Sequence, residues 1–250
     1  MLSELYIRSI AIEEDKLSAD SYTRALPAVR GLLSRGALSF TRPVTFFVGE
    51  NGAGKSTLLE AMAVAYGFNP EGGSRNFSFA TCETHADLGR AMRLGKGVRR
   101  AKTGFFLRAE SFYNVATNID DMDESPSFDP PVIQSYGGVS LHRRSHGESF
   151  LALAENRFGG QGLYLLDEPE AALSPGGLMR LLVRIRQLEM NGSQFVIATH
   201  SPILMTYPGA SLYLLDGEGF RRASYRETEH YQLTRRFLED PEKMYRQLLG

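Results

Sequence analysis

Short apolar runs alternate with helical patterns along this chain. The runs are rich in leucine, β-branched and aromatic residues, which is typical of buried strands in parallel sheets. They span Val44–Val48, Leu163–Leu166, Phe195–Thr199 and Ser211–Leu215. Between the second and third runs, apolar side chains recur at helical spacing at Leu178, Leu181, Leu182, Ile185 and Leu188. Alternating strands and helices predict an α/β fold with a mainly parallel sheet and flanking helices.

The same pattern predicts how the domain is organised. We expect one domain over residues 1–250 whose parts follow one another along the chain: a nucleotide-binding core in 1–68, an insertion in 69–159, the rest of the core in 160–220 and a helical tail in 221–250. The N-terminal part is expected to be β-rich, with a first strand in Leu5–Ile12. Asn69 to Thr103 is rich in glycine and lacks a long apolar pattern, so we expect it to be exposed; an acidic, proline-rich loop follows at 120–131.

Composition and charge narrow the class of protein. With 42% hydrophobic content, 250 residues are enough to build a core, which excludes disorder as the main state. The 28 basic and 29 acidic residues nearly cancel, so any attraction to nucleic acid or an anionic membrane has to be local. The longest stretch without a charged residue, 190–215, contains Pro202 and Pro208, which a spanning helix avoids. With one cysteine, Cys82, and an acidic N-terminal segment, we expect a cytoplasmic protein without a transmembrane segment.

A glycine-rich loop joins the strand at Val44–Val48 to a predicted helix. It consists of Gly49, Glu50, Asn51, Gly52, Ala53, Gly54, Lys55 and Ser56, with Thr57 next. Two glycines five residues apart, followed by Lys and Ser, match the phosphate-loop pattern. Backbone N–H groups of such a loop turn toward phosphates, Lys55 adds a charge for the β and γ oxygens, and Ser56 offers a hydroxyl to Mg²⁺. Because the strand and the helix are both in place, we predict a nucleotide site rather than a merely structural turn.

Two carboxylates follow the apolar strand at Leu163–Leu166. A phosphate loop needs a carboxylate on a neighbouring strand to hold the water shell of the metal, and Asp167 is predicted to do this. Glu168 comes next, where it can polarise the water that attacks the γ-phosphate. The alternative is a solvated acidic turn, which is disfavoured because a buried strand ends directly in the two carboxylates.

Two further motifs have both a functional and a structural interpretation. His200 ends a core strand on the sheet edge that carries the phosphate loop, so its imidazole can hydrogen-bond the γ-phosphate, although a lone histidine at a strand end is more often structural. Ser145, Gly147 and Glu148 stand before an apolar run, and taken alone they predict an ordinary helix start with a Ser cap.

Together these motifs resemble those of the ATP-binding-cassette ATPases, and they occur in the same order. Residues 49–56 resemble Walker A, 145–149 the signature motif, 163–168 Walker B with its catalytic Glu, 172–174 the D-loop, and His200 the switch histidine. The Ser-x-Gly-Glu form, Asp-Glu-Pro-Glu and Ala-Thr-His-Ser-Pro are most similar to predicted ATPases grouped with SMC, Rad50, RecF and OLD proteins, and the whole chain resembles a small bacterial branch of them. Transporter cassettes more often carry Leu-Ser-Gly-Gly-Gln.

The resemblance implies an ATPase that uses ATP and Mg²⁺, with Lys55, Glu168 and His200 as catalytic residues. It further implies a homodimer in which two chains sandwich two ATP molecules head to tail. Residues 145–149 of one chain would then complete the nucleotide site of the other.

Three features depart from the family pattern or leave it open. The Q-loop glutamine, which contacts Mg²⁺, falls near residues 106–111, where Glu110 stands; Gln134 is a weaker candidate because it lies in a loop rich in proline and glycine. The aromatic that stacks on adenine corresponds to Tyr22, which is equally compatible with a half-buried sheet residue. Only 88 residues separate Walker A from the signature, too few for the coiled-coil arms of SMC or Rad50.

The coupled process is the least determined feature of the sequence. Six basic residues without an intervening acid could contact DNA or RNA phosphates, although such runs are usually solvated faces; they are Arg90, Arg93, Lys96, Arg99, Arg100 and Lys102. Our first prediction is an ATPase of nucleic-acid maintenance or defence that works with a separate effector subunit. The alternatives are the nucleotide-binding subunit of a transporter and an ATP-gated protein-interaction module.

Overall fold

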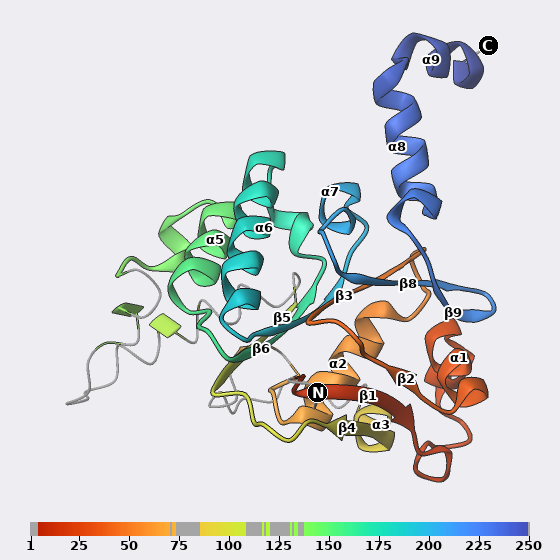
Figure 1. The fold of residues 1–250 in the computed structure, drawn as a ribbon, viewed down its shortest axis with the longest axis vertical. Helices are drawn as coiled ribbons and strands as arrows, with labels where there is room; N and C mark the ends of the chain where they lie inside the picture. The colour runs from red at the N-terminus through yellow and green to blue at the C-terminus, as the bar shows by residue number, and fades with distance from the viewer. Residues whose placement is uncertain are drawn as a thin grey trace.

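The computed structural model describes residues 5–70, 72–73, 86–108, 117, 119–120, 131, 133–134 and 138–249. Its main sheet has the strand order β5-β6-β7-β3-β8-β9 (Figure 1). In that order the strands span Thr103–Arg108, Gly162–Asp167, Gln194–Ala198, Val44–Gly49, Ser211–Asp216 and Gly219–Arg222. The first five are parallel to one another, and β9 is antiparallel to β8. The predicted α/β fold with a mainly parallel sheet is therefore confirmed.

The central strand β3 explains how the phosphate loop is held. It pairs with β7 on one side and β8 on the other, and all six of its residues are buried. Because side chains alternate along a strand, Phe46 and Val48 face one hydrophobic core and Phe47 faces the other. The loop that follows Gly49 is thus anchored to an element packed on both faces.

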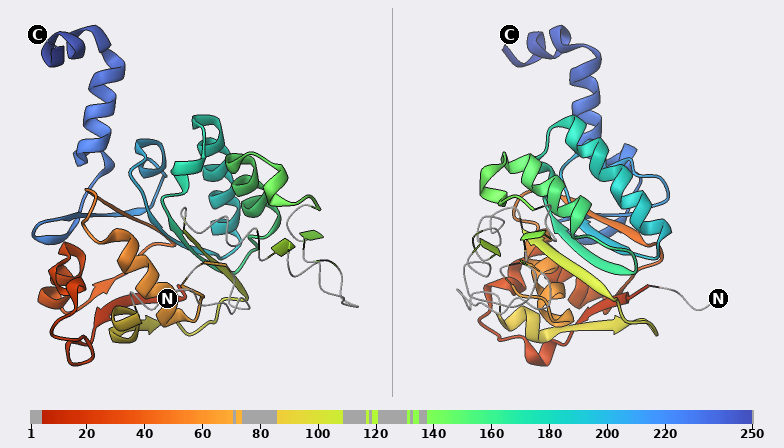
Figure 2. Two further views of the ribbon diagram at one scale, coloured as in Figure 1. Left: turned by 180° about the vertical axis from the view of Figure 1, so that it is seen from behind. Right: turned by 90° about the vertical axis from the view of Figure 1, so that its left-hand side faces the viewer.

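Helices cover both faces of the sheet (Figure 2). The core on one face is built with α1 and α2, and the core on the other face with α5, α6 and α7. The described helices are α1 Pro27–Arg35, α2 Lys55–Tyr66, α3 Ala86–Ala91, α5 His146–Asn156, α6 Pro175–Met190, α7 Pro202–Met205, α8 Glu229–Glu239 and α9 Pro241–Leu249. Short 3₁₀ turns are η1 Glu14–Lys16, η2 Tyr22–Ala25, η4 Leu141–Arg143, η5 Pro169–Ala172 and η6 Tyr225–Glu227.

A small antiparallel sheet corrects the predicted insertion. Its order is β2-β1-β4, from Leu38–Ser39, Ile7–Ile12 and Met92–Lys96. The segment that we expected to be exposed therefore contains α3 and β4, and Met92 is buried. The hydrophobic pattern did not predict β4, because this edge strand buries only its first residue and is held by backbone pairing with β1. Strand β5, also inside the predicted insertion 69–159, belongs to the main sheet.

The C-terminal segment leaves the body of the molecule. Helices α8 and α9 bury none of their residues, and the two views show α8 rising from the side of β8 and β9 with α9 bent across its end (Figures 1 and 2). We call these two helices the C-terminal arm. Across the described ranges, none of the helices is both long enough and apolar enough to cross a membrane.

Candidate active site

The phosphate loop ends at Gly54, which caps the N-terminus of α2. Gly54 has a left-handed backbone, with φ of +89°, and a Cβ at this position would lie 3.1 Å from the Cβ of Leu26 and 3.2 Å from that of Ala28. Glycine is therefore required both for the turn and for the close approach of the chain that enters α1. A recess of about 260 Å³ opens above the loop, lined by Leu26, Asn51, Gly52, Gly54, Lys55, Ser56, Thr57 and Glu168.

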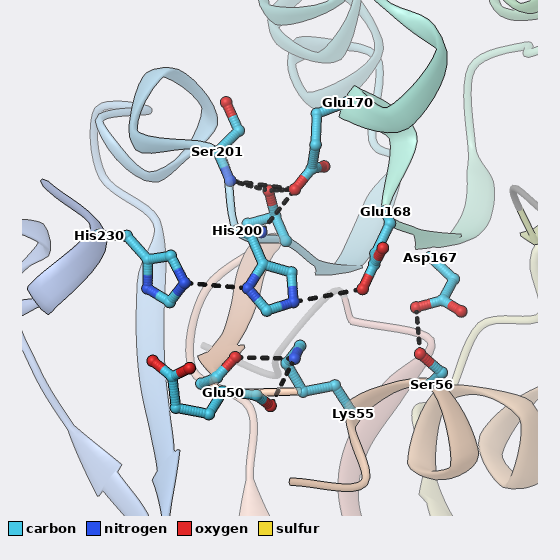
Figure 3. Close-up of polar contacts among 11 residues, drawn as sticks. Glu50, Lys55, Ser56, Asp167, Glu168, Glu170, His200, Ser201 and His230 are labelled. Atoms are coloured by element: carbon cyan, nitrogen blue, oxygen red, sulfur yellow. Dashed lines mark hydrogen bonds and ion pairs between the residues drawn. The ribbon is translucent and has the colours of Figure 1, made fainter. Parts of the chain in front are cut away.

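Lys55 is held by the loop itself. Its Nζ donates to the carbonyl oxygens of Gly49 at 2.7 Å and Glu50 at 3.0 Å, and the residue is only 4% exposed (Figure 3). Burial lowers the pKa of Lys55, while nearby carboxylates, Glu168 first, act to raise it. The ammonium group is thus bound to the loop that precedes the α2 N-terminus, and both the charge and the helix start favour an anion there.

Ser56 and Asp167 form an oxygen pair beside the loop. Ser56 Oγ donates to Asp167 Oδ1 at 3.0 Å. Burial raises the pKa of Asp167 to about 7, and the hydrogen bond from Ser56 partly opposes this shift. A buried carboxylate next to a hydroxyl fits a divalent cation, because hard cations prefer oxygen donors and neutralise the buried charge. The structure brings these two predicted metal residues together.

The third predicted metal residue, Glu110, lies outside the described residues, and the weaker candidate Gln134 is exposed. Close to that position the structure shows a residue that our sequence reasoning missed. Arg108 ends β5 opposite Asp167 in the strand register, and its Nη1 lies 3.0 Å from Glu60 Oε2 in a largely buried ion pair. The sequence signal was a charged residue at the end of the apolar run that forms β5.

Glu168 and His200 meet over the loop. Nε2 of His200 lies 3.2 Å from Oε1 of Glu168 (Figure 3). Glu168 has a left-handed backbone, with φ of +46°, which costs a residue other than glycine about 1–3 kcal/mol. Burial lowers the pKa of His200, and the charge of Lys55 lowers it further. The three predicted catalytic residues, Lys55, Glu168 and His200, come after three different strands and are thus neighbours at the C-terminal edge of the sheet.

Two residues near His200 were not predicted. Glu170 Oε1 accepts hydrogen bonds from Thr199 Oγ1 at 2.7 Å, from His200 N at 2.5 Å and from Ser201 N at 3.0 Å. His230, from the first turn of α8, places Nε2 3.0 Å from Nδ1 of His200. Glu170 had a signal, since it follows Asp167 and Glu168 closely, whereas nothing in the sequence connects residue 230 with this site.

The signature segment does not reach the phosphate loop of its own chain. Ser145 caps α5 in a capping box: its Oγ accepts from Glu148 N, and Glu148 Oε2 accepts from Ser145 N at 3.0 Å. Hydrogen bonds from Ser145 lower the pKa of Glu148. Gly147 lies against the main chain, because a Cβ there would be 2.6 Å from Ala172 O. Ser145 and Glu148 are exposed, and none of the three residues lines the recess above the loop.

Tyr22 contradicts one of its two interpretations, whereas the basic run lies exposed on several elements. Tyr22 lies in η2 and is 53% exposed, so its interpretation as a sheet residue is wrong. Its stacking on adenine stays a prediction. The basic run is divided among elements: Arg93 and Lys96 belong to β4, whereas Arg99, Arg100 and Lys102 line a recess of about 760 Å³ together with Gln161 and Asn191.

Comparisons with known proteins agree with a P-loop ATPase. A family model described as "AAA domain" matches residues 30–106, and one described as "AAA domain, putative AbiEii toxin, Type IV TA system" matches residues 139–206. An uncharacterized ABC transporter ATP-binding protein of Haemophilus influenzae is 33% identical over 107 residues, 42% of this chain and 38% of the relative. The ribose import ATP-binding protein RbsA of Corynebacterium glutamicum is 25% identical over 173 residues, 63% of this chain and 32% of that protein. The chain thus spans about a third of the length of these relatives.

Two solved structures illustrate the range of similar folds. CbiO1 from Clostridium perfringens, part of an ABC transporter complex, aligns with a TM-score of 0.49 at 17% identity, covering 94% of this chain and 96% of that one. The SMC head domain from Thermotoga maritima aligns with a TM-score of 0.40 at 17% identity, covering 88% of this chain and 99% of that one.

Proposed function

We propose that this P-loop ATPase, whose sequence contains AAA-type domain segments, hydrolyses ATP as a nucleotide-dependent head-to-tail homodimer. The observation that carries the proposal is the meeting of Lys55, Ser56, Asp167, Glu168 and His200 at one sheet edge. Lys55 and Ser56 belong to the segment after β3, Asp167 ends β6, Glu168 follows it, and His200 comes after β7. Figure 3 shows these side chains gathered around the phosphate loop. Such an arrangement matches the parts needed for in-line phosphoryl transfer to water.

Each residue has a chemical role in this proposal. The loop amides and Lys55 hold the β- and γ-phosphates, and Ser56 and Asp167 hold Mg²⁺, which supplies positive charge beside the phosphate oxygens. Glu168 orients the attacking water and accepts its proton. His200 donates from Nε2 to a γ-phosphate oxygen, an interaction that strengthens as charge redistributes in the transition state.

The exposed signature segment supports the dimer. Within one chain, Ser145 and Glu148 contact each other and do not line the nucleotide recess. The exposed start of α5 is the positive end of the helix dipole, which suits a phosphate of the partner's nucleotide. A second copy of this chain, placed head to tail, would put that helix start over the partner's γ-phosphate.

We keep nucleic-acid maintenance or defence, within the group of SMC, Rad50, RecF and OLD proteins, as the first proposal for the process. The names of the Haemophilus influenzae and Corynebacterium glutamicum relatives favour a second candidate, the ATP-binding subunit of a transporter. Co-purification with a membrane permease supports the second candidate, and ATP-dependent retention on DNA or RNA supports the first.

Mixing two inactive variants tests the proposed dimer. Glu168→Gln keeps the size of the side chain but removes the base, so ATP binds, hydrolysis stalls and the dimer accumulates. Ser145→Arg blocks closure by its bulk while each chain retains its own phosphate loop. In the mixed dimer, one site combines the intact loop and Glu168 of the Ser145→Arg chain with the intact signature of its partner.

We expect that mixture to recover part of the ATPase activity that neither variant has alone. Light scattering on Glu168→Gln with saturating Mg·ATP should show the mass of a dimer. If the mixture stays inactive and Glu168→Gln stays monomeric, Ser145 is only a helix cap and the head-to-tail dimer is wrong. Activity that is normal in Ser145→Arg alone contradicts the proposal in the same way.

A further inference from the structure

The imidazole of His200 lies between two side chains from different parts of the chain. Nε2 faces Glu168 Oε1 at 3.2 Å, and Nδ1 lies 3.0 Å from Nε2 of His230 (Figure 3). The two imidazole rings are tilted by 57° with centroids 5.0 Å apart, so they meet by their nitrogen edges rather than by stacking. Both nitrogens of His200 therefore have a defined neighbour.

The chemistry of these neighbours determines which nitrogen of His200 carries the proton. A neutral imidazole has one N–H and one lone pair, and its tautomer is inferred from its partners. A lone pair on Nε2 would face the carboxylate of Glu168 and be repelled, so the proton belongs on Nε2. Nδ1 is then the acceptor, and His230 Nε2–H is the donor that it meets.

We propose that His230 is a positioning residue for ATP hydrolysis, which donates to Nδ1 of His200 and so keeps the Nε2–H of His200 directed into the nucleotide site. The inference rests on the proposed function of His200 as the group that contacts the γ-phosphate. Among the described residues, the buried Nε2 of His200 makes no hydrogen bond, because its 3.2 Å contact with Glu168 Oε1 is a charge contact outside hydrogen-bond geometry. The N–H on Nε2 can therefore be given to a γ-phosphate oxygen that enters the site.

The main chain of His200 does not need His230 to hold it. Glu170 already accepts the backbone N–H groups of His200 and Ser201 and the hydroxyl of Thr199. The two anchors therefore have different roles: Glu170 holds the backbone, and His230 acts on the ring alone. A change in ring orientation or tautomer is the effect that loss of His230 should have.

His230 is itself held firmly, although it begins the exposed arm. Thr228, which caps α8, is fully buried; its Oγ1 donates to Tyr225 O at 2.7 Å and accepts from Tyr231 N at 3.4 Å. The rings of Tyr225 and Tyr231 pack edge to face with centroids 4.9 Å apart. The buried cap residue Thr228 thus fixes the start of α8 against the body, and His230, two residues later, can define the position of another ring.

Two substitutions of His230 separate donation from packing. His230→Phe keeps a flat ring but removes the donor, whereas the side-chain amide of His230→Gln can place an N–H where Nε2 stood. We expect His230→Phe to lower kcat roughly tenfold with KM nearly unchanged, the size of effect that the loss of one hydrogen bond produces. His230→Gln should recover most of that loss. Leu238→Gln, a change on the exposed arm, serves as the control with normal kcat.

Imidazole ¹⁵N spectra without nucleotide test the tautomer directly. The His200 signals, identified by their absence in His200→Ala, should show the Nε2–H tautomer in the parent protein and a mixture of tautomers in His230→Phe. Equal losses of kcat in His230→Phe and His230→Gln, or unchanged His200 signals in His230→Phe, overturn the inference. Normal kcat in His200→Ala instead overturns the proposed role of His200, while the spectra still report on the histidine pair.

Discussion

The phosphate loop and the switch region around His200 form one site, but different kinds of contact hold them. In the loop, Gly49–Thr57, the ammonium of Lys55 is bound to carbonyl oxygens five and six residues earlier. In the switch region, Glu170 reaches Thr199, His200 and Ser201 across 29–31 residues, and His230 reaches His200 across 30. The loop is a local backbone structure, whereas the switch region exists only when separate elements have packed.

Nucleotide binding and turnover therefore depend on different parts of the chain. The groups of the loop that would hold phosphates, its N–H groups and the α2 N-terminus, belong to one continuous segment that follows β3. The switch region contains the strained backbone of Glu168 and two carboxylates, Glu168 and Glu170, that both contact His200. Packing of the surrounding elements has to hold this strained backbone in place. We therefore expect variants of the switch region to affect turnover more than nucleotide affinity.

Removing the loop cation should have the largest effect. Lys55→Ala leaves the triphosphate without its charge partner, so Mg·ATP binding should fall below detection by calorimetry while the circular dichroism spectrum stays that of the parent. Lys243→Ala, on the exposed helix α9, is the matched control with unchanged affinity. Normal affinity in Lys55→Ala would remove the loop from the nucleotide site.

Asp167, where the two regions meet, should give the next largest effect. Its pKa is about 7 in the folded protein against a reference of 3.8, because burial disfavours the charged form. The native state therefore binds this proton more tightly than the unfolded chain. The resulting stability is complete below about pH 4 and is lost as the pH rises through about 7, a difference of roughly 4 kcal/mol.

Asp167→Asn removes this titration, since Asn is neutral at all pH values. In the absence of Mg²⁺ and nucleotide, the free energy of unfolding of Asp167→Asn relative to the parent should rise by roughly 4 kcal/mol between pH 4 and pH 8. Urea unfolding at a series of pH values measures it. Parallel profiles for the two proteins would show that Asp167 is already ionised in the folded state at low pH.

Glu170→Gln should have the smallest effect of the three and is the sharpest test of the contrast. Gln keeps one acceptor but loses the charge, and charge-assisted hydrogen bonds are about twice as strong as neutral ones. Among the described residues, Glu170 Oε2 is buried without a partner, so an amide nitrogen there lacks an acceptor. We expect kcat to fall roughly tenfold with ATP affinity unchanged.

Glu218→Gln, at the exposed turn between β8 and β9, provides the control for loss of one negative charge. The contrast between loop and switch region fails if Glu170→Gln weakens ATP binding without lowering kcat. Steady-state turnover together with calorimetry on the same preparations distinguishes these results.

How far the sequence predicted the molecule depends on the range of the contacts involved. Apolar runs predicted β3, β6, β7 and β8, because a strand buried on both faces needs apolar side chains at every position. The edge strand β4 was missed, because it buries only Met92 and its neighbours are half-exposed or exposed. A hydrophobic pattern indicates which positions are buried, and a strand held mainly by backbone pairing has few buried positions.

The candidate site divides in the same way. Residues 49–56, Asp167 and Glu168 were predictable because the motif, the strand before it and the helix after it are continuous in the chain. Arg108 and His230 were not, since their relation to the site depends on strand register and on the placement of α8. Neither relation leaves a pattern in the residues nearby.

Residue order alone was enough to predict a phosphate loop at the end of a buried strand, two carboxylates at the end of another and a mainly parallel α/β sheet. These are properties of short segments, decided by backbone freedom at glycine and by the burial of apolar side chains. The packing of the folded chain, in contrast, makes Glu170 hold the backbone of His200 and brings His230, in the first turn of α8, to the His200 ring. Those contacts join residues about 30 positions apart, and such contacts form only when the packed sheet has already placed both ends.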